Sequence, residues 1–317
     1  MLYANTGTGP RAMLTDATRP GSVPWLDLVC ASEEERALAE RISGLRVPTE
    51  AELAEIETSS RTFQEADALY LSMSMAHRDR QGLARLAPLG FVLSRDTLIT
   101  VRFAELPAVE AFAGKFTAQE SAAAFVGLVG ALVDRMADVL EQLGGELDAI
   151  SGRVFHPDGA IGPKLRDTRL RATLSHVGRI GDALSNLRDS LLGMTRIVQY
   201  VPDAARNWLP DALSASLLSV RQDLQSLGEY DRQLSDKVQF LLDATLGFIN
   251  IEQNNSIKIL TVVSIVGVPP TLVASIYGMN FRNMPELHWA WGYQYGLAVI
   301  VLSAVVPLLL FRWKGWI

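Results

Sequence analysis

Polar residues recur along Asn254–Ser275 at a spacing that could line a path for a cation. Together with the apolar Ile257 and Val268 they stand three or four positions apart and so fall on one face of a helix: Asn254, Ile257, Thr261, Ser264, Val268, Thr271 and Ser275. Their amide and hydroxyl oxygens are neutral ligands of the kind that hard cations use. Ile257, with Leu260 beside the stripe, would form an apolar collar that can close a pore by dewetting.

The same stripe has a plain structural interpretation, because small and hydroxyl-bearing residues often line contacts between membrane helices. The stripe by itself does not decide between helix packing and a pore. The pair Pro269-Pro270 interrupts backbone hydrogen bonding and bends a helix. We expect either a wet lumen or Thr271 to satisfy the freed carbonyls, or else a tolerated kink without function.

Two long apolar segments must position this stripe. Ile259–Tyr277 and Gly292–Phe311 contain no charged residue, and about 20 apolar residues suffice to span a bilayer. Lys258 precedes the first segment and Arg312 and Lys314 follow the second, which is the positive-inside pattern. With no signal peptide recognisable near the N-terminus, we expect a multi-pass protein of a bacterial-type inner membrane with both termini in the cytoplasm.

A long helix is predicted to lead into the first segment. Leucines and other apolar residues recur between Leu213 and Phe248 with heptad-like spacing, interrupted at Asp231 and more weakly at Thr245. No proline occurs between Pro210 and Pro269, so one helix can run from Asp211 to Tyr277, on the order of 100 Å. Such a helix needs neighbours, and several copies would be required to enclose a path.

The first 116 residues mix strand and helix patterns. Strand-like runs are expected at Val23–Val29, Ala68–Ala76, Gly90–Asp96 and Thr97–Phe103, with a hairpin turn between the last two. Ser32 and Thr49 are expected to cap helices. Thr117–Glu120 has capping-box spacing, so we expect a long helix from Thr117 to about Val154. A second should run from about Lys164 to Val201.

Several classes of function are excluded or disfavoured. The net charge of −6 argues against a nucleic-acid partner, and the single Cys30 fits a reducing compartment. No phosphate-binding loop is present. We therefore expect neither an enzyme nor an ATP-driven pump, and no cofactor.

The stretch "GFINIEQNNSIKILTVVSIVGVPPTLVASI" followed by "YGMNF" and "MPEL" resembles the CorA family of magnesium and cobalt transporters. The resemblance implies a homopentamer in which an α/β cytoplasmic domain leads through a stalk helix to a pore-lining span. The expected divisions are an α/β domain at 1–116, a helical region at 117–256 with the stalk from about 211, a first span at 257–277, an outer loop at 278–291, a second span at 292–312 and a tail at 313–317.

The resemblance also assigns roles to residues. Gly278, Met279 and Asn280 would form the selectivity filter, with Asn280 ringing the outer mouth. Mg²⁺ gives up water reluctantly, so five amides could hold the ion by its water shell, and Gly278 would allow the backbone turn that places them. Glu286 would attract cations to the outer loop, and Lys258 would belong to a basic belt. Thr271 and Asn254 would form polar rings, and Ile257 with Leu260 the gate.

The family further implies that cytoplasmic Mg²⁺ holds the pore closed, which makes Mg²⁺ both substrate and regulatory ligand. Candidate stalk acids for this role are Asp223, Glu229, Asp236 and Asp243. Three functions remain open: an influx channel for Mg²⁺ that also passes Co²⁺ or Ni²⁺, a proton-coupled Zn²⁺ transporter of the ZntB branch, and a membrane-anchored signalling or scaffold protein.

Overall fold

The computed structural model describes residues 1–7, 12–14, 23–55, 57, 61–156, 163–279 and 284–315, with side chains left out at 163–167, 286 and 287. The chain forms two units. The first comprises the described residues of Met1–Asp158 and Thr173–Leu242, and the second those of Gly159–Ala172 and Asp243–Ile317.

The first unit contains a seven-stranded sheet in the order β2-β1-β3-β7-β6-β5-β4, in which only β3 and β7 pair in parallel. The strands are β1 (Leu2–Asn5), β2 (Ala12–Met13), β3 (Trp25–Val29), β4 (Thr62–Glu65), β5 (Ala68–Arg78), β6 (Ala84–Leu93) and β7 (Leu98–Arg102). The four predicted strand segments correspond to β3, β5, β6 and β7, with Ser94 and Thr97 closing the β6–β7 turn. The short strands β1, β2 and β4 were not predicted.

A buried ion pair joins the two parallel strands. Asp27 on β3 and Arg102 on β7 are 0% and 1% exposed, and Asp27 accepts hydrogen bonds from Nε and Nη2 of Arg102 at 3.2 and 3.1 Å. Thr100 donates to the same carboxylate at 2.7 Å. The geometry satisfies a pair of charges that would otherwise be costly to bury.

Short helices cover one face of the sheet. Helices α1 (Glu33–Ser43) and α2 (Glu50–Leu53) begin with the predicted caps, Ser32 and Thr49, and each forms a complete capping box. The other face carries Trp25, which packs against Phe112 of α4 (Pro107–Ala113) and against Phe116.

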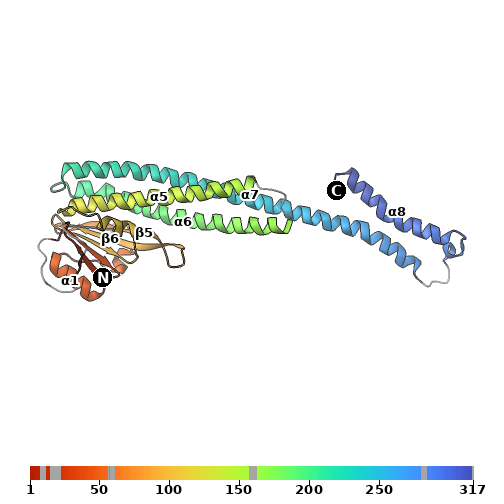
Figure 1. Ribbon diagram of the computed structural model, residues 1–317, viewed down its shortest axis with the longest axis horizontal. Coiled ribbons are helices and arrows are strands. Elements are labelled where there is room, and N and C mark those ends of the chain that lie inside the picture. Colours follow the sequence, from red (N-terminus) through yellow and green to blue (C-terminus); the bar gives the residue numbers. More distant parts are fainter. Residues whose placement is uncertain are drawn as a thin grey trace. The chain divides into compact units, whose positions relative to one another are not determined.

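Three long helices lie beside the sheet in the first unit: α5 (Ser121–Phe155), α6 (Pro163–Ala204) and the beginning of α7 (Asp211–Tyr277) (Figure 1). The predicted cap at Thr117 is wrong, because α5 begins at Ser121 and its N-cap, Glu120, makes no side-chain hydrogen bond. Ser121 instead donates to the carbonyls of Ser94 and Arg95, which ties the start of α5 to the β6–β7 turn.

Close contacts fix α6 on the sheet. A Cβ on Gly193 would lie 2.7 Å from the Cβ of Met73 on β5, so this glycine permits the close approach of helix and strand. Nearby, Ser190 accepts a hydrogen bond from the backbone N–H of Ala76.

The heptad-like seam of α7 is buried at five of its nine predicted apolar positions, and Leu213, Val220, Leu227 and Phe248 are partly buried. Leu217, Leu224, Leu234, Val238 and Leu241 are all less than 9% exposed. The interruption at Asp231 is also buried, and its carboxylate accepts a 2.7 Å hydrogen bond from Arg188 of α6. Asp231 therefore occupies a seam position as an interhelical ion pair. Burial raises the pKa of its carboxyl, and the bond from Arg188 opposes that change.

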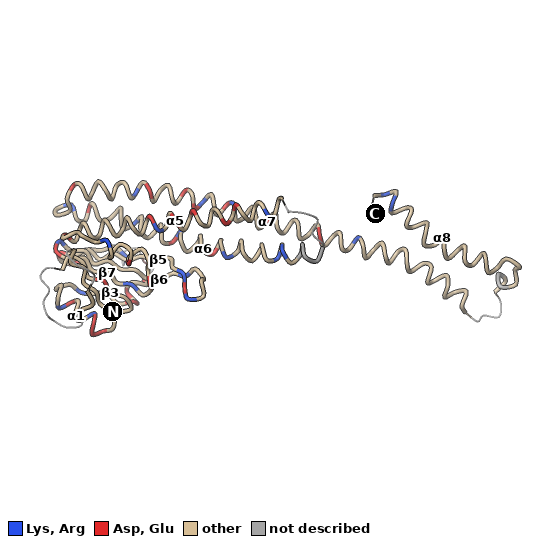
Figure 2. The backbone as a smooth tube through the Cα atoms, viewed as in Figure 1, with Lys and Arg blue, Asp and Glu red and all other residues tan. Residues whose placement is uncertain are grey.

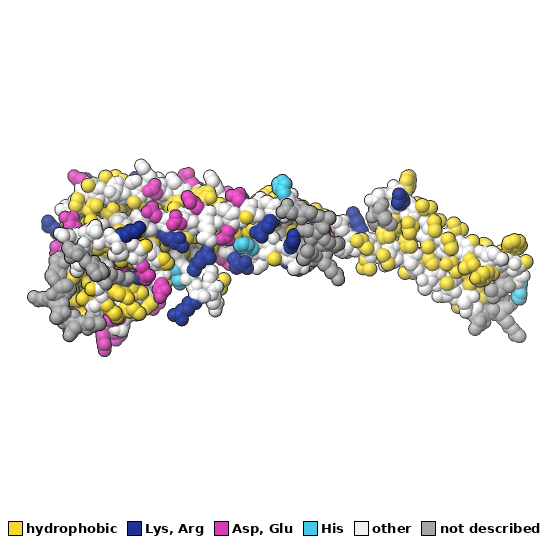
Figure 3. All heavy atoms as spheres, in the orientation of Figure 1, with side chains coloured by type: hydrophobic (Ala, Val, Ile, Leu, Met, Phe, Trp, Pro, Cys, Tyr) yellow, Lys and Arg dark blue, Asp and Glu magenta, His cyan; other side chains and the backbone are white. Residues whose placement is uncertain are grey.

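The second unit contains the end of α7, the short 3₁₀ helix η1 (Pro285–His288) and α8 (Gly292–Trp313). Both α7 and α8 are long and apolar enough to cross a membrane. The tube in Figure 2 carries no charge colour on α7 beyond Lys258, and Figure 3 shows apolar side chains gathered over α8 and the end of α7. These elements agree with the predicted α/β domain, long helix and further apolar helix.

Candidate functional site

The polar stripe of α7 lies on an open face of the helix. Of its seven residues only Thr261 is partly covered, and the others are exposed. Ile257, Leu260 and Val268 are 61%, 67% and 62% exposed. A shallow hollow of about 410 Å³ follows the stripe past Gly267, and Thr271 and Ser275 line it.

The opposite face of α7 is partly covered. Val262, Val266, Val273 and Tyr277 are all partly buried, and each stands two positions from a stripe residue, which is about 200° around the helix. On α8 the partly covered residues also follow helical spacing: Gly292, Gly296, Val299, Ile300, Ser303, Ala304, Pro307 and Phe311. The partly covered residues thus lie on one side of each helix, and the stripe lies on the other, exposed side of α7.

The four hydroxyl groups of the stripe donate hydrogen bonds within the helix and remain free to accept hydrogen bonds. Thr261, Ser264, Thr271 and Ser275 each donate to the carbonyl four residues earlier, at 2.8–2.9 Å. Because the hydroxyl proton is used within the helix, the lone pairs of each oxygen remain available on the exposed side. The stripe thus presents hydrogen-bond acceptors rather than donors. The residue types alone did not show this, because a hydroxyl group can do either.

Of the alternatives expected for the proline pair, satisfaction of the freed carbonyls by Thr271 is wrong. Pro269 and Pro270 lack the N–H groups that would bond the carbonyls of residues 265 and 266 in a regular helix. Thr271 donates to Gly267, whose carbonyl is not one of those two. The helix is nevertheless continuous through both prolines.

The filter residues lie at the edge of the described chain. The chain turns at Gly278, where α7 ends, and it does so without a left-handed backbone. The N–H of Gly278 continues the helix to Ala274, and the next N–H closes a tighter turn from Met279 to Ile276. Asn280 lies outside the described residues, and of Glu286 only the backbone within η1 is described.

The basic and acidic candidates are all exposed on α7. Lys258 lies between Ile257 and the apolar segment. Asp223, Glu229, Asp236 and Asp243 are six or seven residues apart, so their backbones stand about 9–10 Å apart along the axis. Carboxylates so spaced cannot share one Mg²⁺ within a single chain, since the ion requires ligands at about 2.1 Å. Within the described residues no group of three metal-ligating side chains is found.

Small residues of α8 indicate which side of this helix is covered, although they were not among the predicted site residues. Its small residues Gly292, Gly296, Ser303 and Ala304 follow the spacing of a membrane helix interface. They mark the side of α8 that is covered, and so define indirectly which side of α7 is open.

The sequence matches a known family over nearly its whole length. The family model described as "CorA-like Mg2+ transporter protein" matches residues 21–313. The magnesium transport protein CorA of Sodalis glossinidius is 33% identical over 325 residues and covers 100% of both chains. That of Salmonella typhimurium is 33% identical over 293 residues, covering 92% of each.

Solved structures share the fold at lower identity. The CorA magnesium transporter from Methanocaldococcus jannaschii superimposes with a TM-score of 0.77 at 17% identity, over 100% of this chain and 99% of that one. The full-length CmaX protein gives a TM-score of 0.69 at 18% identity, over 99% and 96%. These likenesses support an α/β domain joined to a long helix and a further apolar helix.

Proposed function

The chain belongs to the CorA-like Mg²⁺ transporter family, and we propose that it mediates Mg²⁺ influx across a bacterial-type inner membrane as a homopentameric channel. Since the family is one of transporters, the prediction that the chain is not an enzyme is confirmed. Passage of Co²⁺ and Ni²⁺ belongs to the same proposal.

In this arrangement residues 1–116 and 117–256 lie in the cytoplasm with the short tail at 313–317. The segments 257–277 and 292–312 span the bilayer, and 278–291 forms the outer loop. Five copies of α7 surround the path and α8 lies outside them. No nucleic acid or cofactor takes part.

The observation that carries the proposal is the open polar face of α7 opposite its partly covered face. If α8 covers the back, the stripe faces the centre of any ring that the helices form. A packing interpretation of the stripe within one chain has less support, because the partly covered residues, among them Val266 and Val273, lie on the opposite side of the helix. In a ring of copies, the stripe of α7 would then both line the pore and lie next to the neighbouring copies.

The acceptor oxygens on the stripe suit a hydrated cation. Water bound to Mg²⁺ points its hydrogens outward, so a path for the hydrated ion needs acceptors rather than donors. Thr271 and Ser275 offer such oxygens because their protons are bonded within the helix. A neutral lining also avoids trapping the ion, since conduction needs weak, successive sites.

The remaining roles follow the resemblance. Gly278 and Met279 end the span, and Asn280 rings the mouth and selects the ion by its water shell. Glu286 raises the local cation concentration. Further residues complete the proposal: Ile257 and Leu260 as the apolar gate, Lys258 in a basic belt, Asn254, Thr261, Ser264 and Val268 along the lumen, and Asp223, Glu229, Asp236 and Asp243 as regulatory Mg²⁺ ligands shared between copies.

The test is cation uptake into proteoliposomes containing wild type, Asn280→Ala or Asn283→Ala. We expect Mg²⁺ influx without a proton gradient, reduced about tenfold or more by Asn280→Ala, because a hydrogen bond to a charged group contributes about 1.5–3 kcal/mol. Asn283→Ala controls for a general effect of losing an amide in the same loop.

Other outcomes would contradict the proposal. Zn²⁺ uptake that requires a proton gradient would favour the proton-coupled transporter instead. Absence of flux of any divalent ion would leave the anchored scaffold as the better explanation. Equal loss in both asparagine variants would refute the specific role of Asn280.

A further inference from the structure

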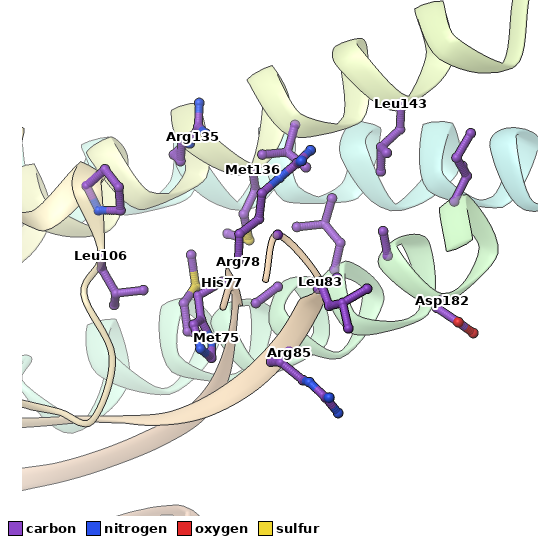
Figure 4. Close-up of a pocket in the computed structure, with 18 of the residues that line it drawn as sticks. Met75, His77, Arg78, Leu83, Arg85, Leu106, Arg135, Met136, Leu143 and Asp182 are labelled. Atoms are coloured by element: carbon purple, nitrogen blue, oxygen red, sulfur yellow. The ribbon is translucent and has the colours of Figure 1, made fainter. Parts of the chain in front are cut away.

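A cavity of about 600 Å³ lies in the first unit, between the end of the β5–β6 hairpin, the loop before α4 and helices α5 and α6 (Figure 4). This volume is typical of small-molecule sites. None of its lining residues belongs to the proposed ion path.

The floor of the cavity is apolar and preformed. Met75 of β5 and Met136 of α5 contribute sulfur atoms, and both are at most 4% exposed. Leu132, Leu143 and Ile180 complete the floor and are equally buried. Methionine sulfur packs favourably against aromatic rings, so this floor suits a flat ring system.

Arginines surround the floor. Arg78, Arg135 and Arg179 line the cavity from β5, α5 and α6. Figure 4 shows Arg78 extending from the strand end toward α5, near Met136. Among the described residues the guanidinium of Arg78 has no hydrogen-bond partner, and that of Arg179 bonds only Ser175 of its own helix, at 3.4 Å. Guanidinium groups recognise phosphate and carboxylate by paired hydrogen bonds and stack on flat rings.

The acids near the cavity offset these arginines only in part, since Arg135 has a long 3.9 Å ion pair with Asp138 and Glu146 is bonded to other groups. Glu146 accepts from His176 at 3.1 Å and from Gln142 at 3.0 Å. Burial acts to raise the pKa of Glu146, but these bonds and the charge of Arg78 outweigh it and lower that pKa. Asp182 points away from the floor in Figure 4, and Glu105 is exposed at the rim.

One residue that lines the cavity also has a buried polar atom without a partner among the described residues. Nδ1 of His77 is buried and has no hydrogen-bond partner in the described part of the chain, and His77 is one of the lining residues. Buried polar atoms without a partner are rare and usually have a functional or structural reason. A ligand group in the cavity would supply one.

We propose that this cavity binds an organic anion of the nucleoside-phosphate class. The ring would lie on the floor formed by Met75 and Met136, and the phosphate would meet the guanidinium of Arg78. The ligand would thereby join the sheet to α5 and α6. The site stands independently of the proposed transport function.

The experiment measures binding of ADP to the purified full-length protein by equilibrium dialysis in metal-free buffer, with adenosine and inorganic phosphate as partial ligands. Arg78→Met removes the charge but keeps an apolar chain. Ala183→Phe fills the cavity from α6 without changing charge. Arg153→Met is the matched control, since Arg153 is an exposed arginine on α5 outside the cavity.

We expect wild type to bind ADP more tightly than adenosine or phosphate. Arg78→Met should weaken binding about tenfold or more, Ala183→Phe should abolish it, and Arg153→Met should leave it unchanged. The proposal is overturned if ADP does not bind wild type, if either partial ligand binds as tightly as ADP, or if both cavity variants bind normally. Thermal unfolding of each variant without ligand verifies that it is folded.

Discussion

Replacing Asp27 by asparagine should destabilise the first unit strongly, although the two side chains have nearly the same shape. The carboxylate accepts two hydrogen bonds from Arg102, whose side chain is 1% exposed. After the substitution the guanidinium stays buried and loses the negative charge beside it, keeping at most one bond to the asparagine oxygen, the carbonyl of Ala104 at 3.3 Å and the exposed Glu110 at 3.5 Å. Stranding a buried charge in this way costs about 3–5 kcal/mol.

A second ion pair provides the comparison. Asp231→Asn breaks the bond to Arg188, but that side chain is 47% exposed and can be rehydrated. The cost should then be closer to that of one charged hydrogen bond, about 1.5–3 kcal/mol, lying at the low end because of the exposure. Asp27→Asn is therefore expected to destabilise the protein more than Asp231→Asn, because Arg102 is buried and Arg188 is exposed.

Thermal unfolding of the full-length protein, followed by tryptophan fluorescence, measures both effects. At about 2–4 °C per kcal/mol for a unit of this size, Asp27→Asn should lower the midpoint by roughly 10 °C and Asp231→Asn by roughly 5 °C. Replacing both partners, Asp27→Leu with Arg102→Met, should recover much of the loss, because no charge is then left buried. Equal shifts for the two asparagine variants, or a double variant less stable than Asp27→Asn, would refute the reasoning.

Three further predictions concern the stripe, helix packing and pH. Thr271→Val should reduce Mg²⁺ uptake in proteoliposomes several-fold by removing an acceptor oxygen, whereas Val273→Thr on the covered face should not; equal effects would contradict the assignment of faces. On α6, Gly193→Ala should lower the free energy of unfolding by about 1–3 kcal/mol through overpacking. Gly178→Ala, which meets open space, should raise it by up to about 1 kcal/mol. If both variants changed the free energy of unfolding in the same direction, the packing argument would be refuted. The hydrogen bond from the Met1 amine, together with the cap bonds of α1, lowers the pKa of Glu35. The ionised carboxylate therefore stabilises the folded protein, by about 1 kcal/mol. This contribution is present above the unfolded pKa near 4.3 and is lost as pH falls through the lower folded value. Urea unfolding of Glu35→Gln against wild type over pH 3–7 should show a difference that disappears in acid.

Local pattern explains which elements could be predicted. The bounds of α7 follow from uninterrupted helical periodicity between Pro210 and the proline pair, and the observed helix begins and ends at the predicted residues. The caps at Ser32 and Thr49 are equally local. Thr117 failed because Ser121, four residues later, bonds a turn distant in the sequence. Strands of two to four residues such as β2 carry too few positions to show alternation.

The two sites differ in how far one helix can specify them. The stripe lies on a single helix, so spacing alone located it, yet the sequence left open whether it faced a neighbour or a lumen. The partly covered residues, among them Val266 and Val273, lie on the side opposite the stripe, which leaves the stripe free to line a lumen. The cavity near Arg78 is assembled from β5, α5 and α6, and no spacing in the sequence connects those segments. A regulatory site shared between copies would be still less visible, because the candidate acids of one helix stand about two turns apart, too far to meet on one ion.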